Sequence, residues 1–352
     1  MSDTPTEWAI DVQNVKKTYR GGTKALRGVD LRVAKGEVFG LLGPNGSGKS
    51  TLVKIMMTVI RRSAGKGSVL GEPIAHKPTL RKIGYLPEHH RFPGYLKGKQ
   101  VLEYVGGLQG MDRTTKKKRA AELLDAVKMT DWAKTPVKRY SKGMRQRLGI
   151  AQALINDPDL VMLDEPTDGV DPVGRRDIRD LCKRMVDEGR TVFLNSHLLS
   201  ELEMVCSRVA IMVQGEVRSQ GTINELVQGQ ERYEIVIAAD PARAAEFLLS
   251  ALPPGAERPE GAGRGTLPSG EWVEISGTTL KIGSTQPETI APVLDNLRRG
   301  GVLIHTVRPM RPSLEDLFMQ AVTDPTTGEA LMPGAAGKKK KRTKAPRAGG
   351  DA

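Results

Sequence analysis

The sequence predicts an α/β fold built on a parallel sheet, followed by a smaller α+β domain. The first observation is an apolar strand-like run at Val38–Leu42, then a glycine-rich turn, then an apolar helical segment at Thr51–Ile60. The second is a pair of short apolar runs at 160–163 and 191–195, typical of strands buried on both faces. The third is a change after Gly221 to short alternating strands and helices. Together they indicate a core of buried strands and a second, smaller unit.

The turn after the first strand reads GPNGSGKS and matches GxxxxGK[ST] in full. Its glycines let consecutive backbone N–H groups face a phosphate without Cβ clashes, and the following helix N-terminus favours an anion. Lys49 is expected to reach the β- and γ-phosphates of a nucleotide, and Ser50 to hold Mg²⁺. The residues predicted to form this site are Gly43, Pro44, Asn45, Gly46, Ser47, Gly48, Lys49, Ser50 and Thr51.

Two carboxylates end the next apolar strand, in LVMLDE at Leu160–Glu165. Asp164 is expected to bind Mg²⁺, directly or through water, and Glu165 to polarise the water that attacks the γ-phosphate. The alternative is a solvated acidic turn at the end of a strand. A phosphate loop in the same chain favours the catalytic interpretation.

Domain boundaries follow from changes in composition. Residues 8–222 hold the α/β core, and the charged, helix-forming segments at 89–155, such as Thr115–Met129, predict a helical subdomain inserted into it. Residues 231–322 predict a small α+β domain whose β-α-β-β-α-β order is that of a ferredoxin-like fold. Its expected elements are Arg232–Ala238, Ala242–Leu252, Trp272–Ile275, Thr279–Ile282, Glu288–Arg299 and Val302–Val307, with a Gly/Pro-rich loop at Pro253–Gly270. Ser313 and Asp316 resemble a capping box that starts a last helix.

The charge is concentrated at the end of the chain. The sequence has 54 lysine and arginine residues against 41 aspartate and glutamate residues, a net charge of +13. Lys338–Ala352 holds seven of the positive residues and one negative residue, so a short tail carries +6. Residues 323–352 are therefore expected to be a disordered basic tail. The basic composition is no argument for a nucleic-acid-binding fold.

Other classes are excluded by what the sequence lacks. No apolar run approaches the ~18 residues of a membrane helix, and the first residues do not resemble a secretory signal. Two cysteines cannot form a disulfide framework. These observations predict a soluble cytoplasmic protein.

Four motifs in a fixed order identify a family. The phosphate loop is followed by YSKGM at Tyr140–Met144, by LVMLDEPTDGVDP, and by His197 in LNSHLLSE. This order resembles the ATP-binding cassette of ABC transporters, over roughly Ile10–Gly221. The YSKGM and YLPE sequences resemble those of ABC-2 exporter-type cassettes. The resemblance implies a P-loop NTPase fold with a RecA-like core and a helical subdomain.

The resemblance also implies roles for single residues in ATP binding. Tyr19 matches the aromatic residue that stacks on adenine, with ordinary strand packing as the alternative. Glu88 occupies the glutamine-loop position, which senses Mg²⁺ and touches the membrane partner. His197 matches the switch histidine at the γ-phosphate. The catalytic residues are therefore expected to be Glu165, His197 and Lys49, and the Mg²⁺ ligands Ser50, Glu88 and Asp164.

The remaining positions point to a second subunit. Ser141, Gly143 and Met144 match the signature that binds ATP held by the opposite subunit, and Asp171 matches the loop that couples the two sites. The sequence departs from the common LSGGQ signature at Lys142 and Met144, and has a glutamate at 88 where glutamine is usual. Gly143 keeps its backbone N–H, and Glu88 can still ligate Mg²⁺.

The resemblance implies an ATPase that dimerises around two ATP molecules, with a second copy or a homologous cassette, and drives a separate transmembrane permease, as an exporter. It would lie in the cytoplasm, peripheral on the inner face of the cell membrane, and the basic tail could touch an anionic lipid surface. The alternative is a non-transport ABC ATPase acting on ribosomes or nucleic acid. No specific nucleic-acid partner is expected.

Overall fold

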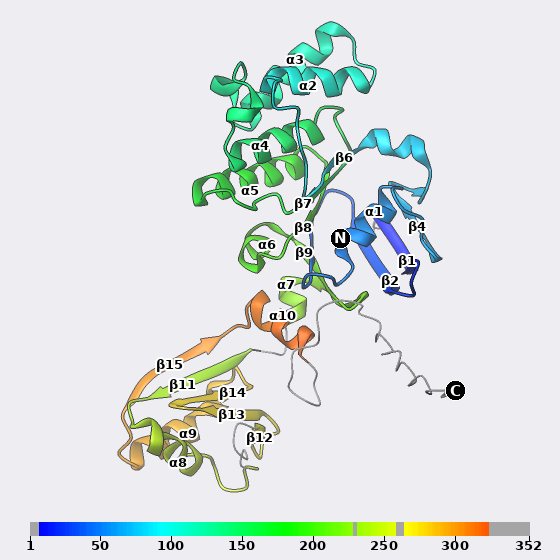
Figure 1. The fold of residues 1–352 in the computed structure, drawn as a ribbon. Helices are drawn as coiled ribbons and strands as arrows, with labels where there is room; N and C mark the ends of the chain where they lie inside the picture. The colour runs from blue at the N-terminus through cyan, green and yellow to red at the C-terminus, as the bar shows by residue number, and fades with distance from the viewer. Residues whose placement is uncertain (1–6, 228–230, 258–263, 324–352) are drawn as a thin grey trace, which may run out of the picture. The chain divides into compact units, whose positions relative to one another are not determined.

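The computed structural model describes residues 7–227, 231–257 and 264–323 (Figure 1). The described residues divide into two compact units: Glu7–Thr222 with Phe318–Thr323, and Ile223–Leu317. Apart from Thr323, the predicted basic tail lies outside the described residues. Within those residues, no helix has both the length and the apolarity needed to cross a membrane.

A six-stranded sheet forms the centre of the first unit, in the order β10-β9-β3-β8-β7-β6. Its first five strands in the chain run parallel, and β10 pairs antiparallel with β9. β3, β7 and β8 are buried along their whole length, as their apolar sequences predict. The strands are β3 (Val38–Leu42), β6 (Ile83–Leu86), β7 (Leu160–Asp164), β8 (Thr191–Asn195), β9 (Arg208–Val213) and β10 (Glu216–Thr222).

A second, antiparallel sheet has the order β2-β1-β4-β5. Its strands are β1 (Trp8–Thr18), β2 (Lys24–Ala34), β4 (Ala64–Val69) and β5 (Glu72–Pro73). One hydrophobic core joins both sheets to helix α1 (Lys49–Met56) and includes Ile10, Leu31, Ile55 and Phe193. The stacked rings of Phe39 and Phe193, 5.9 Å apart, join β3 to β8 within it.

Helix α1 is shorter than the predicted Thr51–Ile60, because a Schellman motif ends it. Thr58 takes the left-handed φ of +58° just past the helix, and its N–H donates to the carbonyl of Ile55. The N–H of Val59 donates to the carbonyl of Lys54. These two bonds satisfy the last carbonyls of the helix and turn the chain away.

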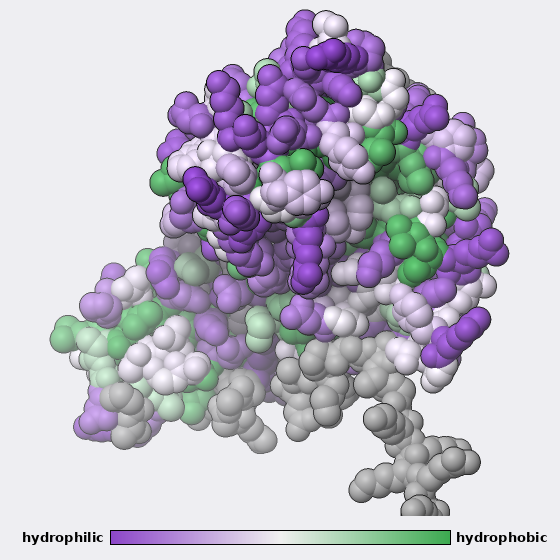
Figure 2. Space-filling model, turned by 45° about the horizontal axis from the view of Figure 1, so that its top comes forward, coloured by the Kyte–Doolittle hydropathy of each residue, from purple (hydrophilic) through white to green (hydrophobic). Residues whose placement is uncertain are grey.

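The inserted helical subdomain consists of α2 (Gly98–Leu108), α3 (Arg113–Ala126) and α4 (Lys142–Ala153). Short 3₁₀ turns η1 (Lys77–Lys82), η2 (Thr130–Trp132) and η3 (Val137–Arg139) lie before and within it. Figure 2 shows that its outward surface is largely hydrophilic. α5 (Pro172–Asp187) and α6 (Leu199–Val205) lie on the side of the parallel sheet opposite α1 (Figure 1).

The second unit has a five-stranded sheet in the order β12-β13-β14-β11-β15. All its pairings are antiparallel, and β13-β14-β11-β15 is the strand order of a ferredoxin-like fold, as predicted. The strands are β11 (Arg232–Ile237), β12 (Arg264–Thr266), β13 (Trp272–Ser276), β14 (Thr279–Ile282) and β15 (Ile304–Met310). β12 corrects the prediction that Pro253–Gly270 is all loop: its three residues pair with β13 as an added edge strand.

Helices α7 (Ile223–Val227), α8 (Pro241–Ser250), α9 (Pro287–Arg299) and α10 (Leu314–Val322) complete the second unit, and the division between the units falls within α10. Leu248 and Val293 from two of these helices share a core with Ile235 and Leu280 of the sheet. The capping box predicted for the last helix is present: the N–H of Ser313 donates to Asp316, and the N–H of Asp316 donates to the Ser313 hydroxyl.

Candidate active site

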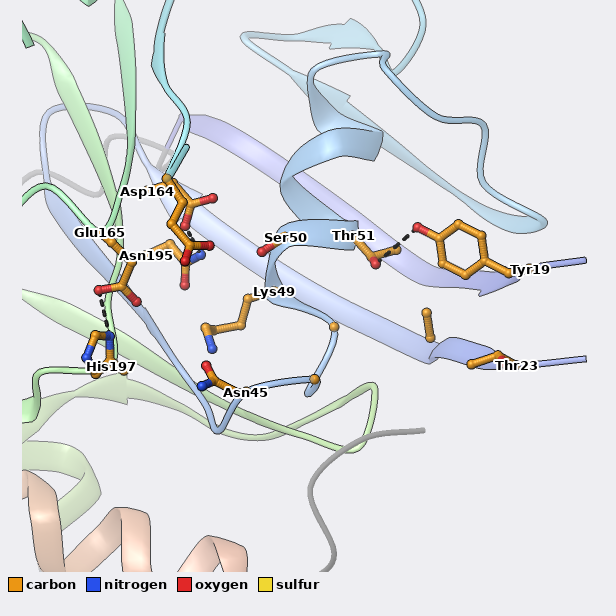
Figure 3. Close-up of a pocket in the computed structure, with 14 residues that line it drawn as sticks. Tyr19, Thr23, Asn45, Lys49, Ser50, Thr51, Asp164, Glu165, Asn195 and His197 are labelled. Carbon is orange, nitrogen blue, oxygen red and sulfur yellow. Dashed lines mark hydrogen bonds and ion pairs between the residues drawn. The ribbon is translucent and has the colours of Figure 1, made fainter. Parts of the chain in front are cut away.

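The candidate site lies at the carboxyl edge of the parallel sheet. The glycine loop follows β3, Glu165 follows β7, and His197 lies two residues after β8. Because Asn195 pairs with Leu41 on one side and with Asp164 on the other, these three strand ends are neighbours in the sheet. They border a cavity of about 450 Å³ (Figure 3).

The cavity brings together most of the residues predicted from the motifs. The predicted residues that line it are Tyr19, Asn45, Gly46, Gly48, Lys49, Ser50, Thr51, Glu88, Asp164, Glu165 and His197. Sequence reasoning missed three further lining residues, Thr23, Ala25 and Asn195. The sequence does offer a signal for Asn195, because it is the polar residue that ends an apolar strand, as Asp164 does. Thr23 and Ala25 lie around the start of β2 and had none.

Two glycines allow the loop to fold tightly against its neighbours. A Cβ on Gly43 would lie 2.3 Å from the carbonyl oxygen of Met212, and one on Gly48, whose φ is +110°, would lie 2.6 Å from that of Ala25. A side chain at either place would force the loop away. Gly43, Pro44 and Ser47 shape this loop without lining the cavity. The Ser47 hydroxyl oxygen is buried and has no hydrogen-bond partner among the residues that the structure describes.

Lys49 places a positive charge inside the loop. Its Nζ donates to the carbonyl oxygens of Gly43, at 2.6 Å, and Pro44, at 3.3 Å. Burial lowers the pKa of this ammonium group, while the charges of Glu165, Asp164 and Glu88 oppose that change. Carbonyl groups hold the ammonium weakly compared with a phosphate, so it can serve an anion in the cavity.

Asp164 is a buried carboxylate with an amide beside it. The Nδ2 of Asn195 donates to its Oδ1 at 2.5 Å. Burial raises the pKa of Asp164 to about 6; the Asn195 hydrogen bond acts in the opposite direction, and the charges of Glu88 and Glu165 add to the rise. Such crowding of carboxylates is relieved by a cation.

The residues present fit Mg²⁺ as part of a nucleotide complex. Ser50, Glu88 and Asp164 all line the cavity and offer the oxygen ligands that Mg²⁺ requires. Among the described residues, no three His, Cys, Asp or Glu side chains form a metal cluster. Mg²⁺ commonly keeps waters and takes its other ligands from substrate phosphates, so a site with few protein ligands suits it.

Glu165 has an unusual backbone that directs its side chain. Its φ is +52°, in the left-handed region, and its N–H donates to the carbonyl of Asn195 at 2.8 Å. Its Oε2 lies 2.8 Å from Nδ1 of His197 and accepts a hydrogen bond from the Ser196 hydroxyl at 3.3 Å (Figure 3). Glu165 is buried, while about half of the His197 side chain is exposed to the cavity or to solvent.

Tyr19 lies at the far end of the cavity, directly after β1. Its hydroxyl lies 3.3 Å from Oγ1 of Thr51 (Figure 3), and the Lys17 ammonium lies 5.2 Å from its ring centroid. Its 40% exposure is too high for ordinary core packing. The ring is available to a flat apolar ligand such as a base.

The residues expected to bind a partner's ATP do not line this cavity. Ser141 is the N-cap of α4, where its Oγ accepts a hydrogen bond from the N–H of Met144. Asp171 is the N-cap of α5, where its Oδ1 accepts one from the N–H of Gly174 at 2.6 Å. Gly143 follows Ser141 in the first turn of α4, so these groups form a separate surface.

The arrangement can bind a nucleoside triphosphate and hydrolyse it. Backbone N–H groups of the loop and Lys49 suit the phosphates, and the carboxylates suit Mg²⁺. Glu165 can accept a hydrogen bond from a water molecule, and His197 holds its carboxylate in place.

Comparison with known proteins agrees with this geometry. A family model described as ABC transporter matches residues 26–168. The chain is 36% identical over 330 residues to the daunorubicin resistance ATP-binding protein DrrA3 of Streptomyces coeruleorubidus. The matched residues cover 92% of this chain and 98% of that protein. It is 33% identical over 316 residues to the Nod factor export ATP-binding protein I of Rhizobium sp., covering 89% of this chain and 96% of the relative.

Solved structures match about three fifths of the chain. One is cbiO1 from Clostridium perfringens, part of the ABC transporter complex cbiONQ, with a TM-score of 0.57 and 27% identity over 62% of this chain and 90% of that one. Another is a dimeric bacterial ABC transporter cassette, with a TM-score of 0.57 and 27% identity over 61% of this chain and 98% of that one.

The raised pKa of Asp164 predicts a pH-dependent stability of the nucleotide-free protein. Because the folded pKa of about 6 exceeds the ordinary 3.8, protonation favours the fold. The stability that protonation of Asp164 adds to the folded state is fully present below pH 3.8, and it is lost as the pH rises through about 6. Asp164→Asn carries no such charge, so we expect it to gain up to about 3 kcal/mol over the wild type between pH 4 and 7.

Urea unfolding in EDTA across this range measures the difference. Asp180→Asn, at an exposed position of α5, is the matched control and should follow the wild type. Equal pH slopes for the wild type and Asp164→Asn would contradict the burial of a charged Asp164.

Proposed function

Because this chain belongs to the ABC transporter ATP-binding proteins of the ABC-2 exporter type, we propose that it drives export of a substrate through a separate membrane permease. It is an ATPase, as the cassettes of this family are. The observation that carries the proposal is the meeting of the phosphate loop, Asp164, Glu165 and His197 around one cavity. Relatives of the chain are named for drug resistance and for Nod factor export, which supports the outward direction.

The catalytic residues have the following proposed roles. The loop from Gly43 to Ser50, with Thr51, holds the phosphates through backbone N–H groups, and Lys49 adds its charge. Ser50, Asp164 and Glu88 hold Mg²⁺, which would neutralise charge on the phosphates when bound. Glu165 accepts a hydrogen bond from the attacking water and so orients it, and His197 fixes the Glu165 carboxylate while facing the γ-phosphate. Tyr19 packs against the base.

Two cassettes are proposed to complete each other's sites. Ser141, Gly143 and Met144 lie outside the cavity of their own chain, as residues that bind a partner's nucleotide must. Asp171 begins α5 beside them and would contact the partner's loop. An isologous dimer of this kind forms two equal composite sites at once. The partner is a second copy or a homologous cassette.

The helical subdomain is the proposed contact with the permease. It exposes Tyr95 by 79%, Tyr104 by 60% and Leu108 by 70%, which gives this subdomain apolar surface that a protein partner could cover. Glu88 lines the cavity and lies in the loop that leads to this subdomain, so its position can depend on both the nucleotide and the permease. The protein would then lie at the inner face of the cell membrane, where the basic tail meets anionic lipid.

The proposed domain roles follow the two units. Residues 8–222, with the helical subdomain at 89–155, form the ATP-binding cassette. Residues 231–322 form an accessory domain. Its buried residues build a core of their own.

Replacing the proposed catalytic carboxylate tests the reaction. We expect Glu165→Gln to lower kcat of ATP hydrolysis by about 10²-fold or more, because the amide cannot accept a proton or hydrogen bond from water in the same way. ATP affinity should stay within about twofold, since the shape is kept. Glu203→Gln, at an exposed glutamate of α6, is the control. Wild-type turnover in Glu165→Gln would remove Glu165 from its role.

Dimerisation is tested with the same slow variant. We expect Glu165→Gln with Mg²⁺ and ATP to double in mass by analytical ultracentrifugation, and to return to the monomer without nucleotide. Ser141→Arg should prevent the doubling, because a long charged side chain would occupy the place of the partner's phosphates. A monomer at tens of micromolar protein with saturating ATP would count against the composite site.

Co-purification from detergent-solubilised native membranes tests the partner. After a high-salt wash, which screens contacts made only by the basic tail, we expect a polytopic membrane protein to remain bound. Mass spectrometry identifies it. Ribosomal or nucleic-acid-binding proteins in its place, with no membrane protein, would favour a non-transport ATPase and leave the hydrolysis chemistry unchanged.

A further inference from the structure

Gln146 is a buried polar residue that the proposed mechanism does not use. It lies on α4, five residues after Ser141, and only 5% of its surface is exposed. Its Nε2 donates a hydrogen bond of 2.9 Å to the backbone carbonyl oxygen of Glu165. A buried amide that donates to the carbonyl of the proposed catalytic residue indicates a role beyond packing.

The backbone of Glu165 needs support from its surroundings. A glutamate gains nothing from a left-handed φ, and such conformations persist only where neighbouring groups fix them. Both adjoining peptide groups of Glu165 are held. Its N–H donates to the carbonyl of Asn195. Its carbonyl accepts the 2.9 Å bond from Gln146 and a longer bond of 3.2 Å from the N–H of Asp168, within the same loop. The bond from Asn195 comes from the sheet itself. The bond from Gln146 comes from the helical subdomain and is the shorter of the two that the Glu165 carbonyl accepts.

Helix α4 therefore connects two parts of the proposed machinery. Its first turn carries the residues proposed to meet the partner's ATP, and its second turn carries Gln146. A helix moves as a rigid element over this length. The same helix meets the same loop at a second, exposed point, where Lys142 Nζ lies 2.7 Å from Oδ2 of Asp168. A shift of the first turn would therefore move Gln146 and, through its hydrogen bond, the backbone of Glu165.

We propose that Gln146 is a positioning residue that holds the Glu165 backbone in its left-handed conformation. The orientation of the Glu165 carboxylate then depends on the position of helix α4. The inference rests on the proposed role of Glu165 in hydrolysis. In a dimer it gives each chain a way to adjust its own carboxylate to the nucleotide that its signature touches in the partner's site.

The first test removes the hydrogen bond and keeps the volume. We expect Gln146→Met in the full chain to lower kcat at least tenfold, with KM and the Kd for ATP within about twofold. Gln152→Met, at a half-buried position of the same helix, should behave as the wild type. Unchanged kcat in Gln146→Met, or a fall in ATP affinity and melting temperature that accounts for the loss, would overturn the proposal.

A double-mutant cycle shows whether Gln146 acts through Glu165. If it does, adding Gln146→Met to Glu165→Gln causes no further loss of kcat. Losses that multiply would overturn the proposal, because Gln146 would then act elsewhere. If Glu165→Gln by itself has wild-type kcat, the proposed function of Glu165 fails instead, and the two failures are distinguishable.

A second variant keeps the test usable if the methionine variant folds poorly. Gln146→Glu has almost the same shape and can donate to the Glu165 carbonyl only when protonated. Burial raises the pKa of an acid at such a place. We therefore expect its kcat, relative to the wild type at each pH, to recover as the pH falls from 8 to 6. A pH-independent ratio would count against a hydrogen bond from position 146.

Discussion

The parallel pairing of β3, β8 and β7 is the constraint on which the site depends. Parallel strands end at the same edge of a sheet, and Asn195 pairs with Leu41 and Asp164 at that edge. The segments that end near Leu41, Asp164 and Asn195 are 123 and 31 residues apart in the sequence, and they therefore emerge side by side. A shift of one residue in either pairing would turn Asp164 or Asn195 to the other face of the sheet and break the contact between them. The apolar core that fixes this register therefore also fixes the geometry of the candidate site.

The same constraint collects charges that repel one another. Asp164, Glu165 and Glu88 face one cavity, and burial raises the pKa of Asp164 while it lowers that of Lys49. Asp164 and Lys49 would each be better solvated in water, because both are buried. Asn195 donates a hydrogen bond to the Asp164 carboxylate, and the Lys49 ammonium donates one to the carbonyl of Gly43, so both groups keep their places. A site arranged in this way favours ligands that bring the missing charges, and a triphosphate with a divalent cation brings both.

Most of the site could be predicted because it consists of contiguous motifs. The loop at 43–50, the carboxylates at 164 and 165, and His197 follow strands whose apolar sequence is plain. Residues that enter the cavity through the fold alone could not be predicted: Ala25 belongs to a strand of the second sheet, Thr23 lies just before that strand, and neither carries a chemical signal. The left-handed φ of Glu165 is likewise invisible, since glutamate is no marker of that conformation. The early end of α1 was missed because a threonine, and not a glycine, takes the left-handed position.

The placement of α4 also explains why the signature and the catalytic carboxylate occur in one chain, although they are proposed to act on different nucleotides. If each chain only supplied half of its partner's site, the signature could stand on any element that reaches the interface. It stands on the helix whose next turn contacts the backbone of Glu165. Closure of the interface would then act on both sites together, because each signature that engages a nucleotide also fixes the carboxylate of its own chain. In a symmetric dimer this arrangement makes hydrolysis at either site depend on occupancy of the other.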